Sequence, residues 1–211
     1  MRPVRTRRHL LRCTAALALA GATATPALAA AAIGQAAPAF SAVDTSGRRV
    51  ALADFRGRTV VLEWVNPGCP FVRRHYDAGN MQAVQKAALD KGVAWLAVNS
   101  TAADAADYLA PERLSAWMRQ HKAAVTATLM DADGKVGRAY GARTTPHMYV
   151  IDARGVLVYA GAIDDRPAAR GPEIAGATNH VRAALADVLA GRPVGTPSTP
   201  PYGCTVKYAA P

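Results

Sequence analysis

Residues 60–76 read Val60-Val-Leu-Glu-Trp-Val-Asn-Pro-Gly-Cys-Pro-Phe-Val-Arg-Arg-His-Tyr76, with a single cysteine between an apolar run and a polar one. The apolar run, Thr59 to Val65, is β-branched at its start and predicts a buried strand. Asn66-Pro67-Gly68 then ends the strand. Cys69 follows where a helix would begin, and the free N–H groups and positive dipole of a helix start favour a thiolate. We therefore expect a reactive thiol at Cys69, and the alternative is a buried, inert cysteine.

The first 29 residues are typical of an export signal. Five arginines precede an apolar run from Thr14 to Ala24, and Ala27-Leu28-Ala29 offers a cleavage site. Residues 6–12 resemble the twin-arginine export motif, and an ordinary Sec signal is the alternative. The apolar run is too short and too rich in Ala and Thr for an anchor, so no membrane insertion is expected after cleavage. The protein is therefore predicted to reach the bacterial periplasm or the exterior.

After cleavage of the signal, the remaining chain is long enough for one domain with its own hydrophobic core. The chain has 211 residues and a formal charge of +10 from 25 basic and 15 acidic residues. Without the five arginines of the signal, 20 basic residues face 15 acidic ones, which leaves +5. No basic stripe with interleaved aromatic residues remains, so a nucleic-acid partner is not expected. Residues 34–191 are predicted to form the domain, and residues 192–211, with five prolines, an extended surface tail.

The predicted elements alternate between strands and helices. Apolar periodicity and turn residues predict a hairpin over residues 39–52, strands over 59–65, 93–98, 147–152 and 156–161, and helices over 80–91, 111–122, 135–140 and 178–190. This order predicts an α/β fold with a mixed central sheet flanked by helices, an N-terminal β-hairpin and the extended tail.

That order, with a cysteine after the first long strand, resembles the thioredoxin fold, and more closely a redoxin of the AhpC/TSA, peroxiredoxin-like group. The resemblance runs from about Gly34 to Gly191. It is carried by Ala37-Pro-Ala-Phe40, Leu52-Ala-Asp-Phe-Arg-Gly57, Val60-Val-Leu62, Cys69-Pro70, Asp131-Ala-Asp-Gly134, Tyr140-Gly-Ala-Arg-Thr-Thr-Pro146 and Tyr149-Val-Ile-Asp152. The resemblance implies a thioredoxin-like fold and thiol chemistry.

Three positions depart from the motifs of these families. The second cysteine of the thioredoxin Cys-x-x-Cys motif is replaced by Val72. Peroxiredoxins also carry a hydroxyl residue three positions before the reactive cysteine, where this chain has Asn66, and a proline where it has Leu62. The hydroxyl that would position a peroxide is missing there.

The resemblance also assigns roles around Cys69. Glu63 matches a buried acid that relays protons in thioredoxins, and the alternative is a carboxylate that is partly solvated or paired with an arginine. Thr145-Pro146 matches the cis-proline loop that faces the cysteine and pairs with substrate; an ordinary trans turn is the alternative. Pro70 and His147 are candidates for the same substrate-binding face. Residues 73–75 are expected to face solvent.

Cys204, in the tail, is the only other cysteine that remains after signal removal. It could resolve an oxidised Cys69, form a static disulfide with it, or stay free or pair between chains. We favour a Cys69–Cys204 bond, because the exported compartment is oxidising. Closing so long a loop would stabilise the fold by about 4–5 kcal/mol.

The function expected from these residues is that of an exported thiol–disulfide oxidoreductase of peroxiredoxin-like type, acting on protein thiols and disulfides or a small peroxide. Cys69 is its nucleophile, Cys204 its resolving cysteine and Glu63 its proton carrier. No cofactor or resident metal is expected. The alternatives are a non-catalytic binding module with a structural Cys69–Cys204 disulfide, and a copper chaperone that would add His147 to the two cysteines.

Overall fold

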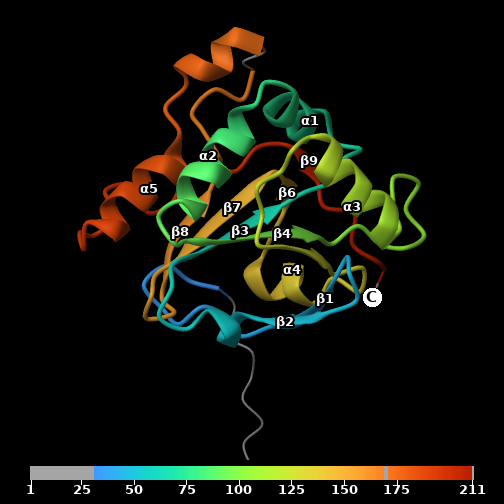
Figure 1. Cartoon of the computed structure of the whole chain (residues 1–211), viewed down its shortest axis with the longest axis horizontal. Coiled ribbons are helices and arrows are strands. Elements are labelled where there is room, and N and C mark those ends of the chain that lie inside the picture. The colour runs from blue at the N-terminus through green and yellow to red at the C-terminus, as the bar shows by residue number, and fades with distance from the viewer. Residues whose placement is uncertain (1–30, 169–170, 211) are drawn as a thin grey trace, which may run out of the picture.

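The structure, a computed structural model, describes residues 31–168 and 171–210 (Figure 1). Its strands are β1 (Ser41–Asp44), β2 (Arg49–Ala51), β3 (Val60–Trp64), β4 (Ala94–Asn99), β5 (Ala127–Met130), β6 (Thr144–Thr145), β7 (His147–Ile151), β8 (Leu157–Gly161) and β9 (Cys204–Thr205). Its helices are α1 (Pro70–Asp77), α2 (Asn80–Leu89), α3 (Pro111–Gln120), α4 (Lys135–Tyr140) and α5 (His180–Leu189), with 3₁₀ turns at Leu52–Phe55 and Gly171–Gly176. The predicted hairpin, strands and helices are confirmed to within two residues at either end, whereas β5, β6 and β9 were not predicted.

Among the described residues, seven strands form one mixed sheet in the order β2-β1-β5-β4-β3-β7-β8. Strand β4 pairs parallel with both β3 and β5, whereas β7 pairs antiparallel with both β3 and β8. A second, two-stranded sheet joins β6 to β9. The mixed central sheet predicted from the element order is therefore confirmed.

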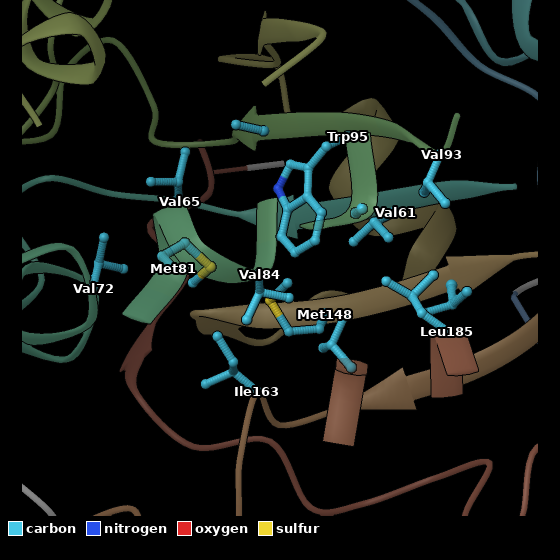
Figure 2. Close-up of a cluster of buried hydrophobic side chains, with 14 of the residues drawn as sticks. Val61, Val65, Val72, Met81, Val84, Val93, Trp95, Met148, Ile163 and Leu185 are labelled. Carbon is cyan, nitrogen blue, oxygen red and sulfur yellow. The ribbon is translucent and has the colours of Figure 1, made fainter. Parts of the chain in front are cut away.

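Helices cover both faces of the large sheet. Figure 1 shows α1, α2 and α5 on one side and α4 on the other. On the first side, Trp95 lies among Val61, Val84 and Met148 in a buried apolar cluster, part of which Figure 2 shows. Burying large apolar side chains in this way is the main favourable term in folding. Because side chains alternate along a strand, β3 contributes to both sides, with Val61 on this face and Leu62 on the other.

The C-terminal tail packs along the domain. It is extended, as predicted, but it does more than lie on the surface. Ser198 forms a parallel bridge to Ala160, and the carbonyl oxygen of Lys207 accepts a hydrogen bond from the backbone N–H of Ala102 at 2.8 Å. Val206 is buried. The tail thus runs from the edge of the large sheet to the end of β4, and it passes α1 on the way (Figure 1).

The predicted export signal, residues 1–29, lies outside the described residues. Of the helices that the structure describes, none combines the length and the apolar character that a membrane span requires.

Candidate active site around two cysteines

Cys69 lies at the start of α1, as the sequence predicted. It is the N-cap residue, with φ −81° and ψ 123°, and Pro70 is the first residue of the helix. The preceding turn is fixed by Asn66, whose backbone oxygen accepts from the N–H of Cys69 at 2.9 Å and whose Oδ1 accepts from the N–H of Gly68 at 2.7 Å. A Cβ at Gly68 would stand 2.7 Å from a carboxylate oxygen of Asp107, so the turn requires glycine. Strand, turn and helix together hold the cysteine in place.

The tail brings Cys204 to Cys69. Their Sγ atoms are 2.7 Å apart, although 135 positions separate the two residues along the chain, and both are free thiols in this structure. Cys69 is only 2% exposed, whereas Cys204 is half-buried. A disulfide has an S–S length of about 2.05 Å, so an oxidant that takes two electrons and two protons from the thiols could join the sulfurs after only a small movement.

The cis-proline loop completes the enclosure of Cys69. The Thr145-Pro146 peptide bond is cis, as the resemblance implied. Thr145 pairs with Cys204 in the β6–β9 ladder, and its carbonyl oxygen accepts a hydrogen bond from the Cys69 thiol at 3.0 Å. Just before Cys204, a Cβ on Gly203 (φ 141°) would overlap this same carbonyl group. Only glycine allows the tail to approach the loop so closely.

The two thiols differ in acidity. Burial opposes ionisation of Cys69, but the Cys204 thiol, the Thr145 hydroxyl and the backbone N–H of Val72 outweigh it, so the pKa of Cys69 lies below its usual value. The Thr145 hydroxyl is buried and has no other hydrogen-bond partner, which leaves it free to donate to a thiolate. Burial and the neighbouring Cys69 raise the pKa of Cys204 to about 11. Cys69 is therefore the more acidic thiol of the pair, and Cys204 keeps its proton at neutral pH.

Glu63 is fully buried on the sheet face that also carries Cys69. Its carboxylate accepts from Tyr76 Oη at 2.9 Å, from Gln85 Nε2 at 2.9 Å and from Trp95 Nε1 at 2.7 Å. Burial raises the pKa of Glu63, and these three donors oppose the shift. Glu63 is thus buried, as predicted, and it is neither partly solvated nor paired with an arginine of the described residues, whereas its role in proton transfer stays a prediction. No hydrogen bond between described residues joins Glu63 directly to either cysteine.

Comparison with known families agrees with this arrangement. The family model described as the AhpC/TSA family matches residues 33–160, which is more than half of the chain. The chain belongs to the AhpC/TSA family. Among the curated proteins, no match was found for this AhpC/TSA protein.

Three solved structures are similar to this AhpC/TSA protein. A hypothetical protein from Sinorhizobium meliloti is 30% identical, with a TM-score of 0.74, over 87% of this chain and 98% of its own. An uncharacterized conserved protein from Geobacillus kaustophilus is 28% identical, with a TM-score of 0.74, over 85% of this chain and 94% of its own. A thiol:disulfide interchange protein from Bacteroides sp. is 25% identical, with a TM-score of 0.50, over 62% of this chain and 81% of its own. The chain is thus a thioredoxin-fold redoxin.

His147 lies next to the cis-proline but away from the cysteines. Its Nδ1 accepts from the backbone N–H of Arg143 at 3.3 Å and is 3.1 Å from Tyr149 Oη. Tyr149 belongs to the cluster on the opposite sheet face from Cys69. Burial lowers the pKa of His147 to about 4, so the ring is neutral at pH 7. No hydrogen bond between described residues joins His147 to either cysteine.

The expectation that residues 73–75 face solvent is wrong for His75. Arg73 is exposed and Arg74 half-buried, but His75 is completely buried. The side chain of His75 faces Tyr202 of the tail, with Nε2 3.0 Å from Tyr202 Oη. The polar run Arg73-Arg74-His75 suggested a solvated helix face; the apolar residues at 71, 72 and 76 were the signal that this helix is buried on most sides.

The hypothesis of a copper site requires His147 as a third ligand beside Cys69 and Cys204. Over residues 31–168 and 171–210, no group of three or more His, Cys, Asp and Glu side chains is placed to hold a metal ion. Cys69 and Cys204 are together, but His147 is not with them. The three-ligand site of the copper hypothesis is therefore not formed by the described residues.

Proposed function

We propose that this redoxin is an exported thiol–disulfide oxidoreductase that cycles between the Cys69–Cys204 dithiol and an intramolecular disulfide. The observation that carries the proposal is the 2.7 Å separation of two sulfurs with opposite pKa shifts. A low-pKa thiolate beside a protonated thiol is the arrangement that reactive dithiols require. The proposal assigns residues 34–191 to the redoxin domain, residues 192–211 to a tail that supplies Cys204, and residues 1–29 to the export signal.

Electrons enter the oxidised pair at Cys204. A partner thiolate attacks Cys204 Sγ, the Cys69–Cys204 bond breaks, and Cys69 leaves as a thiolate. Exposure and acidity both favour this direction, because Cys204 is the more accessible sulfur and the thiol with the lower pKa leaves faster. A second thiolate of the same partner then attacks the partner sulfur that is bonded to Cys204 in the mixed disulfide. Cys204 leaves and takes up a proton, and the partner is released as a disulfide.

The same pair can be reoxidised by a small peroxide. The Cys69 thiolate attacks one peroxide oxygen, the O–O bond breaks, and the other oxygen leaves as water or an alcohol after taking up a proton. The Cys204 thiol then displaces water from the Cys69 sulfenic acid and restores the disulfide. Because Cys69 is 2% exposed, exchange with thiols at Cys204 is the main activity proposed.

Thr145 and Glu63 support the thiolate in this proposal. The Thr145 hydroxyl donates a hydrogen bond to the ionised Cys69 sulfur. The cis peptide bond to Pro146 holds Thr145 against the cysteine. Glu63, whose pKa is raised by burial, is the proposed proton carrier beneath the site. Pro70 begins the helix whose Val72 N–H lowers the pKa of Cys69.

The proposed partners are protein thiols and disulfides. The redoxin family and the similarity to a thiol:disulfide interchange protein support this class. A soluble peptide with two cysteines is therefore the appropriate probe. The oxidised protein should convert it to the peptide disulfide, and Cys69→Ser and Cys204→Ser should each abolish the transfer. A wild-type protein that transfers no faster than these variants contradicts the proposal.

A second candidate is a binding module with a permanent Cys69–Cys204 disulfide. It is favoured by the burial of Cys69 and by the anchoring of the tail on both sides of Cys204. A structural bond predicts that the folded protein keeps its disulfide in excess dithiol and is reduced only after unfolding. Reduction of the folded protein within minutes under those conditions excludes this candidate.

A further inference from the structure

Tyr202, two residues before Cys204, belongs to a polar cluster with Asn80, His75 and Asp164. Tyr202 Oη donates to Asp164 Oδ1 at 2.5 Å and is 3.0 Å from His75 Nε2. Asn80 Nδ2 donates to His75 Nδ1 at 3.0 Å, so the ring proton is on Nε2, which then donates to Tyr202. The hydrogen bonds form one directed chain from Asn80 to Asp164, and Tyr202 is the only member that belongs to the tail.

Two members of the cluster, His75 and Asp164, are shielded from water, whereas Tyr202 and Asn80 are half-buried. His75 is fully buried, Asp164 is 2% exposed, and Asp164 Oδ2 has no hydrogen-bond partner. Burial lowers the pKa of His75 to about 4, so the ring is neutral at pH 7. Burial and the nearby Asp164 raise the pKa of Tyr202, so its hydroxyl keeps the proton it donates. Removing a buried partner from such a network leaves a polar group unsatisfied, which makes the arrangement specific.

The aromatic ring of Tyr202 also makes contacts with α1. Its centroid is 6.0 Å from that of Phe71, and the Arg74 guanidinium lies 5.2 Å from it. Phe71, Arg74 and His75 come from the first two turns of α1, the helix that begins directly after Cys69. The tail is therefore anchored to the same helix that positions the nucleophile.

A short, tightly packed link joins this anchor to Cys204. The single intervening residue is Gly203, where any Cβ would overlap the Thr145 carbonyl, and Cys204 itself pairs with Thr145. Such packing leaves Cys204 little freedom to move once Tyr202 is fixed. Holding two reacting groups together raises their effective concentration.

We propose that Tyr202, held by His75 and Asp164, is a positioning residue that fixes Cys204 against Cys69 and sets the dithiol–disulfide equilibrium of the pair. The proposal rests on the redox function proposed above. Tyr202 touches neither sulfur in this role; it acts through Cys204. Loss of its hydroxyl should free the tail in the reduced state, lower the effective concentration of the Cys204 thiol and disfavour the disulfide.

The test is Tyr202→Phe, which keeps the ring and removes the hydroxyl. The matched control is Tyr208→Phe, because Tyr208 is also a tail tyrosine, whose hydroxyl donates to the carbonyl oxygen of Ala142 at 2.7 Å outside the polar cluster. Each protein is equilibrated with reduced and oxidised glutathione, and thiol tagging with mass detection gives the fraction oxidised. We expect Tyr202→Phe to lower the equilibrium constant for the disulfide about tenfold, which is about 30 mV, and Tyr208→Phe to leave it within about twofold.

A purely structural role predicts a different result. It would lower the free energy of unfolding of the reduced and oxidised forms equally and leave the redox equilibrium constant unchanged; that outcome overturns the proposal, as does an equal shift in both variants. If Tyr202→Phe does not fold, Asp164→Asn, which weakens the acceptor of the Tyr202 proton, should shift the equilibrium in the same direction, and an unchanged equilibrium overturns the proposal. A wild-type protein that forms no intramolecular disulfide with glutathione defeats instead the redox function.

Discussion

The backbone of Cys204 pairs with the backbone of Thr145, the residue before the cis-proline. A free strand edge at this place could receive an added strand from another polypeptide. Here the chain's own tail occupies it and places a thiol 2.7 Å from Cys69. The tail thus takes the position beside the nucleophile that an extended protein substrate would otherwise need. In the proposed function, the half-buried Cys204 is therefore the point of contact for partner thiols.

The accessible sulfur should be the one that forms mixed disulfides. In Cys69→Ser, the remaining Cys204 loses the neighbouring thiolate that raises its pKa, and it is the more exposed position. We expect it to react with oxidised glutathione about tenfold faster, or more, than Cys69 does in Cys204→Ser, where the thiol is enclosed. Mass spectrometry of the glutathionylated proteins over time gives both rates. Faster reaction at Cys69 would reverse the proposed order of attack.

The acidity of Cys69 should depend on Cys204. The Cys204 thiol is the largest influence that lowers the pKa of Cys69, so Cys204→Ala should move that pKa upward toward its ordinary value of 9.0. Site-resolved alkylation by iodoacetamide as a function of pH measures the midpoint. Thr205→Ala, which changes an exposed neighbour on the same strand, should leave it in place. An unchanged or lowered midpoint in Cys204→Ala would contradict the assignment of the thiolate.

Glu63 should make the stability of the protein depend on pH. Because burial raises its folded pKa above 4.5, the native protein holds this proton at pH values where the unfolded chain has lost it. The free energy of unfolding should therefore fall as pH rises from about 4.5 toward neutrality, and Glu63→Gln should reduce that slope. Urea titrations of both proteins across this range test it. Identical slopes would mean that Glu63 stays ionised throughout.

Forming the disulfide should stabilise the native state. The bond would close a loop of 135 positions, for which the chain-entropy estimate is about 4–5 kcal/mol. Urea unfolding with and without dithiothreitol measures the difference, and Cys204→Ser should match the reduced protein under both conditions. Equal free energies of unfolding for the reduced and oxidised proteins would show that the disulfide does not stabilise the native state.

Local features of this chain were predictable from its sequence. The apolar run before Cys69, the breaker Asn66-Pro67-Gly68 and Pro70 at the first helical position each act over a few residues, so strand, turn and helix start followed directly. The cis-proline came from the family resemblance. The Cys69–Cys204 proximity could be inferred only because no other cysteine remained after the predicted signal is removed.

Contacts between distant segments were not predictable in the same way. The cluster around Tyr202 draws on α1, the start of α2, the loop after β8 and the tail, and its hydrogen bonds join residues up to 127 positions apart. No periodicity in the sequence predicts that these four segments come together. The polar run Arg73-Arg74-His75 indicated a solvated helix face for His75. Strand β5 was missed because it is only four residues long and follows a run rich in alanine.

The most direct test of the redox pair is to map its disulfide through one cycle. The purified protein is reduced, reoxidised with glutathione disulfide, digested without reductant and analysed by mass spectrometry at each stage. The account predicts that the peptides containing Cys69 and Cys204 become linked to each other in the oxidised sample, and that a dithiol added to the folded protein returns both to free thiols. Two cysteines that remain separately alkylatable after oxidation, or a link that the dithiol cannot open in the folded protein, would contradict it.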